Sequence, residues 1–162
     1  MGNPARGGLS ILTYAIVEVN GMATVHLKEG SALPEEAVVS LYASVGWTAY
    51  TDDPASLMQA IRNATYVVTL WEGETLIGLA RCLSDDVAIC YVQDILVRPA
   101  YQGQGYGRQL MTACQRRFDH VRMMVLVTDD EARQHQFYRS QGFSLMREMA
   151  APLHAFVKLR ST

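Results

Sequence analysis

The segment that most restricts how this chain can fold spans residues 94–108. An apolar run ends at Pro99, which has no backbone N–H to give to a sheet and therefore favours the end of a strand. Glycines then alternate at Gly103, Gly105 and Gly107, and apolar residues with helical spacing follow. The segment predicts a buried strand, a glycine-rich loop and a helix, in that order.

The expected helix has no side chain to cap its start. No Ser, Thr, Asp or Asn stands between residues 100 and 108, so the first helical amides lack a side-chain acceptor. The alternating glycines also remove the side chains that would hold a ligand away from those amides. A positive helix end favours an anion by about 0.3 to 1 kcal/mol. The pattern predicts a phosphate-binding loop, and a glycine-rich turn without a ligand is the alternative.

Two common phosphate-binding motifs do not match this loop. A P-loop ends in Gly-Lys-Ser/Thr, whereas this chain has Gly107-Arg108-Gln109. The dinucleotide fingerprint requires a third glycine, and that position holds Arg108 or Leu110, depending on which glycine is counted first. We therefore expect neither of these two nucleotide sites.

The remaining sequence predicts an α/β fold with a mixed sheet. Several β-rich runs precede one strand–helix alternation, which favours a largely antiparallel central sheet with helices on both faces. The expected strands are 23–27, 65–71, 75–82, 87–98, 123–128, 143–146 and 155–159, and the expected helices are 34–44, 52–62, 105–118 and 130–141.

Composition limits the class of protein. The chain has 162 residues, 49% of them apolar, and a formal net charge of -2, which suits a soluble globular domain and predicts no nucleic-acid partner. No run approaches the ~18 to 20 apolar residues that cross a bilayer, so no membrane partner is expected. Residues 1–21 are expected to be a poorly specified extension before a single domain over residues 22–162.

The cysteines and histidines predict neither disulfides nor a metal. The three cysteines lack CxxC spacing and fit free thiols packed in a reducing cytoplasm. The histidines have no ligand spacing, and the one within the expected helix 130–141 fits a solvated surface position. These residues are Cys82, Cys90, Cys114, His26, His120, His154 and His135.

Two motifs give the chain a family resemblance. Gln102-x-x-Gly105-x-Gly107, after Leu96-Val97-x-Pro99, resembles the Q/R-x-x-G-x-G/A signature of the GNAT superfamily, the acetyl-CoA-dependent N-acetyltransferases. Phe137-Tyr138-x-x-x-Gly142-Phe143 matches the second landmark of that family. The resemblance covers residues 64–146 well and the N-terminal helices loosely. It implies the GNAT fold, with a sheet that is splayed at the coenzyme site.

The resemblance implies acetyl-CoA as the co-substrate and names the residues that bind it. Backbone groups of Leu96 and Val97 would pair with the pantetheine arm, because their strand splays from the strand at 123–128. Backbone amides of the loop would hold the pyrophosphate. The loop residues are Gln102, Gly103, Gln104, Gly105, Tyr106, Gly107 and Arg108.

The resemblance also implies catalytic roles. Tyr138 would protonate the departing CoA thiolate, whereas the residues alone favour a packed core tyrosine. Asp94 is a candidate general base, or else a structural partner of Arg81, Arg98 or a backbone amide. Many members of the family need no dedicated base, because water relays the proton.

Two further positions bear on the site. Trp47 and Tyr50 lie where the family lines its acceptor pocket, and the alternative for Trp47 is packing between helices. Glu131 and Gln134 replace the Asn and Ala that often precede the family tyrosine, which puts the usual Asn contact with CoA in doubt.

The function expected from this resemblance is transfer of acetyl from acetyl-CoA to a primary amine, on a small molecule or a peptide, by direct attack in a ternary complex. The alternative is a non-catalytic acyl-CoA-binding or sensing module. A third possibility is O-acetylation or peptide N-terminal acetylation on the same fold. Formation of a homodimer is left open.

Overall fold

The computed structural model describes residues 24–159, and the chain divides after Val127 into two compact units that are each described by themselves. The expected extension, residues 1–21, lies outside the described residues. No helix among residues 24–159 is long and apolar enough to span a membrane.

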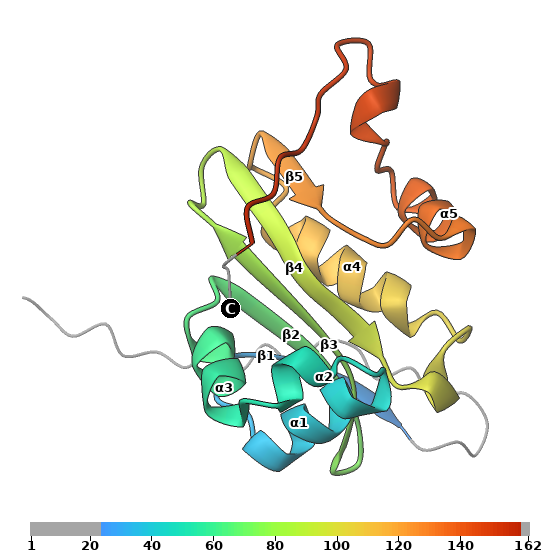
Figure 1. The fold of residues 1–162 in the computed structure, drawn as a ribbon. Coiled ribbons are helices and arrows are strands. Elements are labelled where there is room, and N and C mark those ends of the chain that lie inside the picture. The colour runs from blue at the N-terminus through green and yellow to red at the C-terminus, as the bar shows by residue number, and fades with distance from the viewer. Residues whose placement is uncertain (1–23, 160–162) are drawn as a thin grey trace, which may run out of the picture. The chain divides into compact units, whose positions relative to one another are not determined.

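Residues 24–127 hold the sheet and four of the helices described here (Figure 1). The elements are β1 (Val25–Glu29), α1 (Glu35–Ser44), α2 (Thr48–Thr51), α3 (Pro54–Arg62), β2 (Tyr66–Glu72), β3 (Thr75–Ser84), β4 (Ile89–Val97), the 3₁₀ turn η1 (Pro99–Tyr101), α4 (Tyr106–Arg117) and β5 (Met123–Leu126). The second unit contains α5 (Ala132–Ser140) and the 3₁₀ turn η2 (Met146–Glu148).

The sheet is mixed, as the sequence predicts. Its strands follow the order β1-β2-β3-β4-β5; the first four pair antiparallel, and β5 runs parallel to β4. Gly73, with φ of +57°, makes the tight turn between β2 and β3. A parallel neighbour requires a crossover connection, and α4 provides it between β4 and β5.

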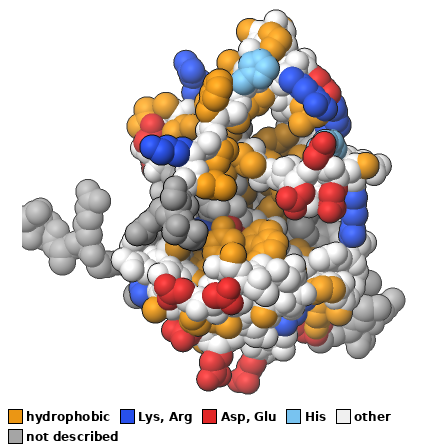
Figure 2. All heavy atoms as spheres, viewed as in Figure 1, with side chains coloured by type: hydrophobic (Ala, Val, Ile, Leu, Met, Phe, Trp, Pro, Cys, Tyr) orange, Lys and Arg blue, Asp and Glu red, His pale blue; other side chains and the backbone are white. Residues whose placement is uncertain are grey.

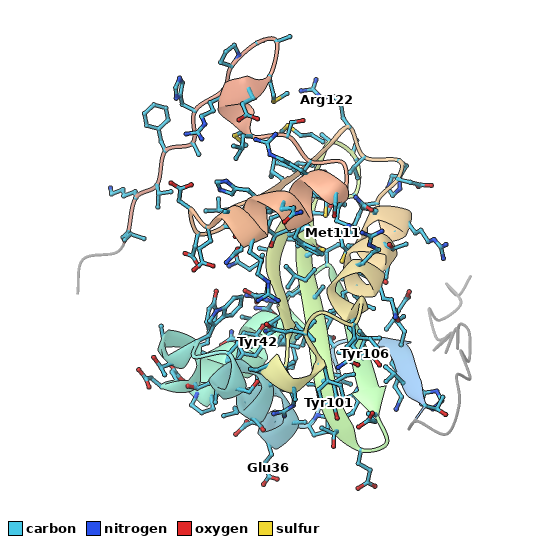
Figure 3. The ribbon with its side chains drawn as sticks, turned by 90° about the vertical axis from the view of Figure 1, so that its right-hand side faces the viewer. Glu36, Tyr42, Tyr101, Tyr106, Met111 and Arg122 are labelled. Atoms are coloured by element: carbon cyan, nitrogen blue, oxygen red, sulfur yellow. The ribbon has the colours of Figure 1, made fainter. Side chains whose placement is uncertain are left out.

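Helices cover both faces of the sheet within this unit, which confirms the expectation (Figures 1 and 3). Helices α1 and α3 pack on one face, in a core that contains Leu79 and Leu96. Helix α4 packs on the other, where Leu110 Cδ1 lies 3.2 Å from the position that a Cβ on Gly78 would occupy. Gly78 and Leu79 face opposite ways because side chains alternate along a strand.

The start of α3 follows directly from its sequence. Asp53 Oδ1 accepts a hydrogen bond from the amide of Ser56 at 3.1 Å, and Pro54 occupies the first helical turn. A carboxylate cap and a proline with preset φ are the usual signals of a helix start. Helix α2, which the sequence did not predict, turns the segment after α1 and carries Tyr50.

The two closing strands expected at 143–146 and 155–159 are wrong. Residues 146–148 form η2, and residues 149–159 contain no strand, with Phe156 96% exposed. A short apolar run becomes a strand only where another strand accepts its hydrogen bonds, and the run itself does not specify that neighbour.

Candidate active site

The glycine loop presents an open backbone at the start of α4. Gly103 and Gly105 have φ of +77° and +87°, a region in which side-chain-bearing residues are strained. A Cβ added at either glycine would meet no atom within 4 Å. Gly105 is the N-cap of α4, and no side chain of the described residues caps this helix start. The first amides of α4 therefore have no side-chain acceptor among the described residues, as the sequence predicts.

Side chains of the loop hold its shape. Gln102 Nε2 donates to the Val97 carbonyl at 2.9 Å, and Gln104 Nε2 donates to the Ala100 carbonyl at 3.1 Å. Tyr101 donates to Glu72 Oε2 at 2.5 Å, which ties η1 to the turn between β2 and β3. Tyr101 and Tyr106 lie at the two ends of the loop, with ring centroids 6.3 Å apart (Figure 3). The Gln102 amide also donates to the Pro99 carbonyl at 3.2 Å, so the backbone amides after Gln102 are the groups offered to a ligand.

Among residues 24–127, one edge of β4 has no strand partner along its second half and is called the open edge below. Its parallel pairing with β5 ends at Val92 opposite Leu126, although β4 continues to Val97. The amide of Arg98 donates to Ile77 on the β3 side. The N–H and C=O of one residue point to the same edge of a strand, and the next residue points its own pair to the other edge. Val97 and Ile95 therefore direct their N–H and C=O groups to the open edge.

This register changes the expected contacts of Leu96. The N–H and C=O of Leu96 point to β3, where Leu96 pairs with Leu79, so the open edge is formed by Ile95 and Val97. The sequence analysis missed Ile95, although the period of two along a strand would have excluded adjacent residues from sharing one edge. The carbonyl of Val97 is already used by Gln102, which leaves its N–H for a ligand.

Asp94 lies at the centre of a buried hydrogen-bond network. Its side chain accepts from Arg81 Nε at 2.6 Å and from the Tyr42 hydroxyl at 2.8 Å, both at Oδ2. Oδ1 accepts from the Tyr50 hydroxyl at 3.3 Å. Asp94 and Arg81 are only 1% and 5% exposed. The partner of Asp94 is thus Arg81, whereas Arg98 bonds to the Leu76 carbonyl and to Ser40.

The pKa shifts in this network favour a charged Arg81–Asp94 pair and two neutral tyrosines. Burial and the Asp94 carboxylate raise the pKa of Tyr42 well above its usual range, and the same two causes raise the pKa of Tyr50. Burial disfavours the charged form of Arg81, but Asp94 outweighs that effect and the pKa of Arg81 is raised. Arginine and aspartate neutralise each other here, and both phenols stay protonated.

Trp47 and Tyr50 join Tyr42 in a cluster of three rings beside this network. Ring centroids are 5.8 Å apart for Tyr42 and Trp47, 5.4 Å for Tyr42 and Tyr50, and 5.9 Å for Trp47 and Tyr50. Trp47 and Tyr50 are both partly exposed, while Tyr42 is fully buried. The two outer rings therefore have a packed side and a side that faces solvent.

Tyr138 lies on α5 of the second unit. Its ring packs edge-on against Phe137 at 5.1 Å and Phe143 at 6.1 Å, and its carbonyl accepts from the amides of Gln141 and Phe143 at the end of the helix. Burial raises the pKa of Tyr138, and the Thr128 hydroxyl opposes this shift. The side chain therefore carries its proton at neutral pH, which a general acid requires.

The cysteines are free and buried, as the sequence predicts. Among the described residues, no three His, Cys, Asp or Glu side chains gather to hold a metal ion. His135 lies partly exposed, with Nε2 3.3 Å from Asp130 Oδ1.

Comparisons with known proteins agree with this geometry. The model of the acetyltransferase (GNAT) family matches residues 35–143. A relative from Prochlorococcus marinus, named an uncharacterized N-acetyltransferase (ycf52-like), is 32% identical over 111 residues, or 65% of this chain and 59% of the relative. The chain thus spans less than two thirds of the length of that relative.

Solved structures show the same fold. A GNAT-family acetyltransferase from Streptococcus pneumoniae superposes with a TM-score of 0.74 at 27% identity, covering 85% of this chain and 99% of the other. An aminoglycoside acetyltransferase from an uncultured soil sample, solved with sisomicin, has a TM-score of 0.62 at 15% identity, covering 84% of this chain and 97% of that protein. The similarity to the aminoglycoside acetyltransferase shows a shared fold and nothing about the substrate of this chain.

Proposed function

Because the chain belongs to the GNAT acetyltransferase family, we propose that it transfers the acetyl group of acetyl-CoA to a primary amine by direct attack in a ternary complex. One observation carries the proposal: the open edge of β4 leads into a glycine loop whose amides are uncapped. A ligand with peptide-like amides and a pyrophosphate matches both parts, since the amides complete the sheet edge and the phosphates accept from the loop.

The residues of the first unit fit acetyl-CoA as co-substrate. The loop amides from Gly103 to Arg108 would bind the pyrophosphate, helped by the positive end of α4, whereas Gln102 supports the loop through its own amide and side chain. The N–H of Val97 and the peptide groups of Ile95 would pair with the pantetheine arm. When bound, acetyl-CoA supplies an activated thioester.

Acyl transfer to an amine needs two proton movements. The amine must lose a proton to expose its lone pair, and the new N–C bond then forms as the C–S bond breaks. The departing sulfur takes up a proton, which we assign to the Tyr138 hydroxyl. Water relays the amine proton to solvent, because Asp94 is neutralised by Arg81 and already accepts from three donors. The Tyr138 phenolate regains its proton from solvent after the transfer.

The cysteines support direct transfer rather than a covalent acetyl-enzyme. All three are buried. The hydrogen bond with Cys114 raises the pKa of Cys82, and that with Cys82 raises the pKa of Cys90, with burial adding to both shifts. Buried thiols with a raised pKa are poor nucleophiles.

The surface around α1–α3 suits a cationic acceptor. Figure 2 shows acidic side chains (red) gathered over this region, and Glu35, Glu36, Asp52 and Asp53 are exposed there. A negative surface raises the local concentration of ammonium ions and speeds their association. This supports an amine, which is protonated in water at neutral pH, over an alcohol as acceptor.

Release of CoA that depends on an added amine tests the function. The purified protein is incubated with acetyl-CoA and, separately, spermidine, tyramine, a lysine peptide and an aminoglycoside, while a thiol reagent follows free CoA. We expect at least one amine to accelerate release. Stabilisation of the protein by acetyl-CoA without any amine-dependent release would instead identify a non-catalytic binding module.

Replacement of Gly105 by valine is expected to abolish stabilisation by acetyl-CoA. A ligand at 100 times its Kd adds about 2.7 kcal/mol to the free energy of unfolding. A branched side chain at the N-cap of α4 would block the amides, so this gain should vanish in thermal melts. Gly107→Val makes the same test within α4, where no left-handed φ is required.

Gly46→Val is the matched control for the strain at Gly105. Gly46 also has a left-handed φ, +77°, and open space around its Cβ position, but it lies between α1 and α2. Both substitutions should cost on the order of 2 kcal/mol of stability, and only Gly46→Val should keep the acetyl-CoA shift. An undiminished shift in Gly105→Val and Gly107→Val would contradict the pyrophosphate assignment.

A further inference from the structure

Gln93 occupies an irregular position on β4, at the point where the open edge begins. Arg81 of β3 pairs with Asp94, but the next residue, Cys82, pairs with Val92. Gln93 is therefore the extra residue of a β-bulge, and pairing with β5 ends at its neighbour Val92. A bulge changes the direction of its side chain, and Gln93 Nε2 donates a hydrogen bond to the Tyr50 hydroxyl oxygen at 3.2 Å.

The hydrogen bonds from Arg81 to Gln93 have a fixed direction. A carboxylate only accepts hydrogen bonds, so the Tyr50 hydroxyl donates its single hydrogen to Asp94 Oδ1. The raised pKa of Tyr50, caused by burial and by Asp94, keeps that proton in place. The phenol oxygen can then only accept from Gln93, which turns the amide nitrogen toward Tyr50 and the carbonyl oxygen, Oε1, away from it.

This chain of hydrogen bonds ends at Gln93 Oε1, an acceptor whose orientation is set by the bond between Gln93 Nε2 and Tyr50. Within residues 24–127, no donor hydrogen-bonds Gln93 Oε1, and the side chain is partly exposed. The residues behind it are closely packed: Asp94, Arg81 and Tyr42 are buried, and the Tyr50 ring packs against Tyr42. A free acceptor held by a rigid support binds a donor with little loss of conformational entropy.

We propose that Gln93 Oε1 accepts a hydrogen bond from the nitrogen of the acceptor amine and sets its position against the thioester. This inference rests on the proposed function, in which the pantetheine arm follows the open edge from the glycine loop toward Gln93. Tyr50, Asp94 and Arg81 are positioning residues that act through Gln93. This oxygen requires a hydrogen-bond donor, and both an ammonium ion and a neutral amine supply one.

A neutral acceptor suits an amine that must lose a proton. A carboxylate at this position would stabilise the ammonium ion and raise its pKa by about 1 to 3 units, which keeps the nucleophile protonated. A carboxamide orients the nitrogen without that effect. The charges that face Gln93, from Asp94 on its own strand and Arg81 on β3, already cancel each other, and Tyr42 and Tyr50 are uncharged.

Two substitutions at Gln93 test the proposal with an amine that the wild-type protein turns over. Gln93→Leu keeps the size and removes the acceptor, so KM for the amine should rise about 5-fold, the value of one hydrogen bond. Stabilisation by acetyl-CoA should be unchanged. Gln93→Glu should move the acidic limb of the kcat/KM profile to higher pH by about 1 unit. Gln59→Leu, at an exposed position on α3, is the matched control.

Tyr50→Phe tests the positioning role through the same readout. Without the phenol oxygen the Gln93 amide loses its fixed orientation, so KM for the amine should rise, and Tyr50→Phe combined with Gln93→Leu should add little further. An unchanged amine KM in Gln93→Leu, or an unchanged pH profile in a folded Gln93→Glu protein, overturns the proposal. Failure of the wild-type protein to release CoA with any amine contradicts the proposed function itself, which separates the two cases.

Discussion

Replacement of Asp94 by asparagine is expected to destabilise the fold by about 3 to 5 kcal/mol, because it leaves the buried Arg81 guanidinium without its counter-charge. Arg81 lies 2.6 Å from Asp94 Oδ2 with 6% of its side chain exposed, so water cannot replace the lost charge. Asparagine has one carbonyl oxygen and can accept from either Tyr42 or Tyr50, which donate to different oxygens of Asp94. Thermal and urea melts of the variant measure the difference in free energy of unfolding.

Two controls distinguish the effect of an unpaired buried charge from other causes of lost stability. Asp86→Asn breaks an exposed ion pair with Arg117, in which the two side chains are 48% and 37% exposed, and should cost less than about 1 kcal/mol. The double variant Arg81→Met with Asp94→Leu removes both charges and should recover much of the stability lost in Asp94→Asn. Equal melting of Asp94→Asn and wild type would contradict the anchoring role.

The same variant tests Asp94 as a general base. If Asp94 took a proton from the amine, the acidic limb of the pH–rate profile would vanish in Asp94→Asn. We expect the limb to remain and acetyl-CoA still to bind, because Arg81 and two phenols already occupy both carboxylate oxygens. Loss of the limb at unchanged stability would assign Asp94 to the chemistry.

Replacement of Tyr138 by phenylalanine is expected to lower kcat about 10-fold or more, because general acids contribute ~10²- to 10⁴-fold. The ring keeps its packing against Phe137 and Phe143, so stability and acetyl-CoA affinity should change little. Burial raises the pKa of Tyr138 above its ordinary value near 10, so the hydroxyl stays protonated and ionisation should limit activity only at still higher pH.

Tyr66→Phe is the control for the loss of a tyrosine hydroxyl. Tyr66 donates to Glu29 Oε1 at 2.8 Å, away from the glycine loop and the open edge of β4. Its removal should leave kcat unchanged in steady-state assays with acetyl-CoA and amine. Unaltered kcat in Tyr138→Phe as well would make Tyr138 a packing residue of α5.

Local features of the site were predictable because they depend on neighbours in sequence. Gly103 and Gly105 adopt the left-handed φ for which glycine is favoured, and the missing cap at α4 is a property of residues 100–108 alone. The strand that ends before Pro99 and the cap of α3 by Asp53 follow from the same kind of short-range rule. The roles of Tyr138 and Tyr50 remain predictions.

Pairing between distant segments was not predictable in the same way. The expected strands at 143–146 and 155–159 had suitable composition but form no strand in the described residues. The bulge at Gln93 arises from the register of β4 against β3, which no residue of β4 specifies by itself. Ile95 replaces Leu96 at the open edge for the same reason.

The sequence by itself determined the strand, the glycine loop, the uncapped helix and the family, because backbone geometry and capping act over a few residues. Only the tertiary structure decided that Asp94 pairs with Arg81 rather than Arg98, and that Tyr50 connects it to Gln93. Tyr50 and Asp94 are separated by 44 positions in the chain. Contacts of that kind are set by how α2, β3 and β4 pack together, since burial makes an unpaired charge costly and leaves the carboxylate to the donors that packing brings within reach.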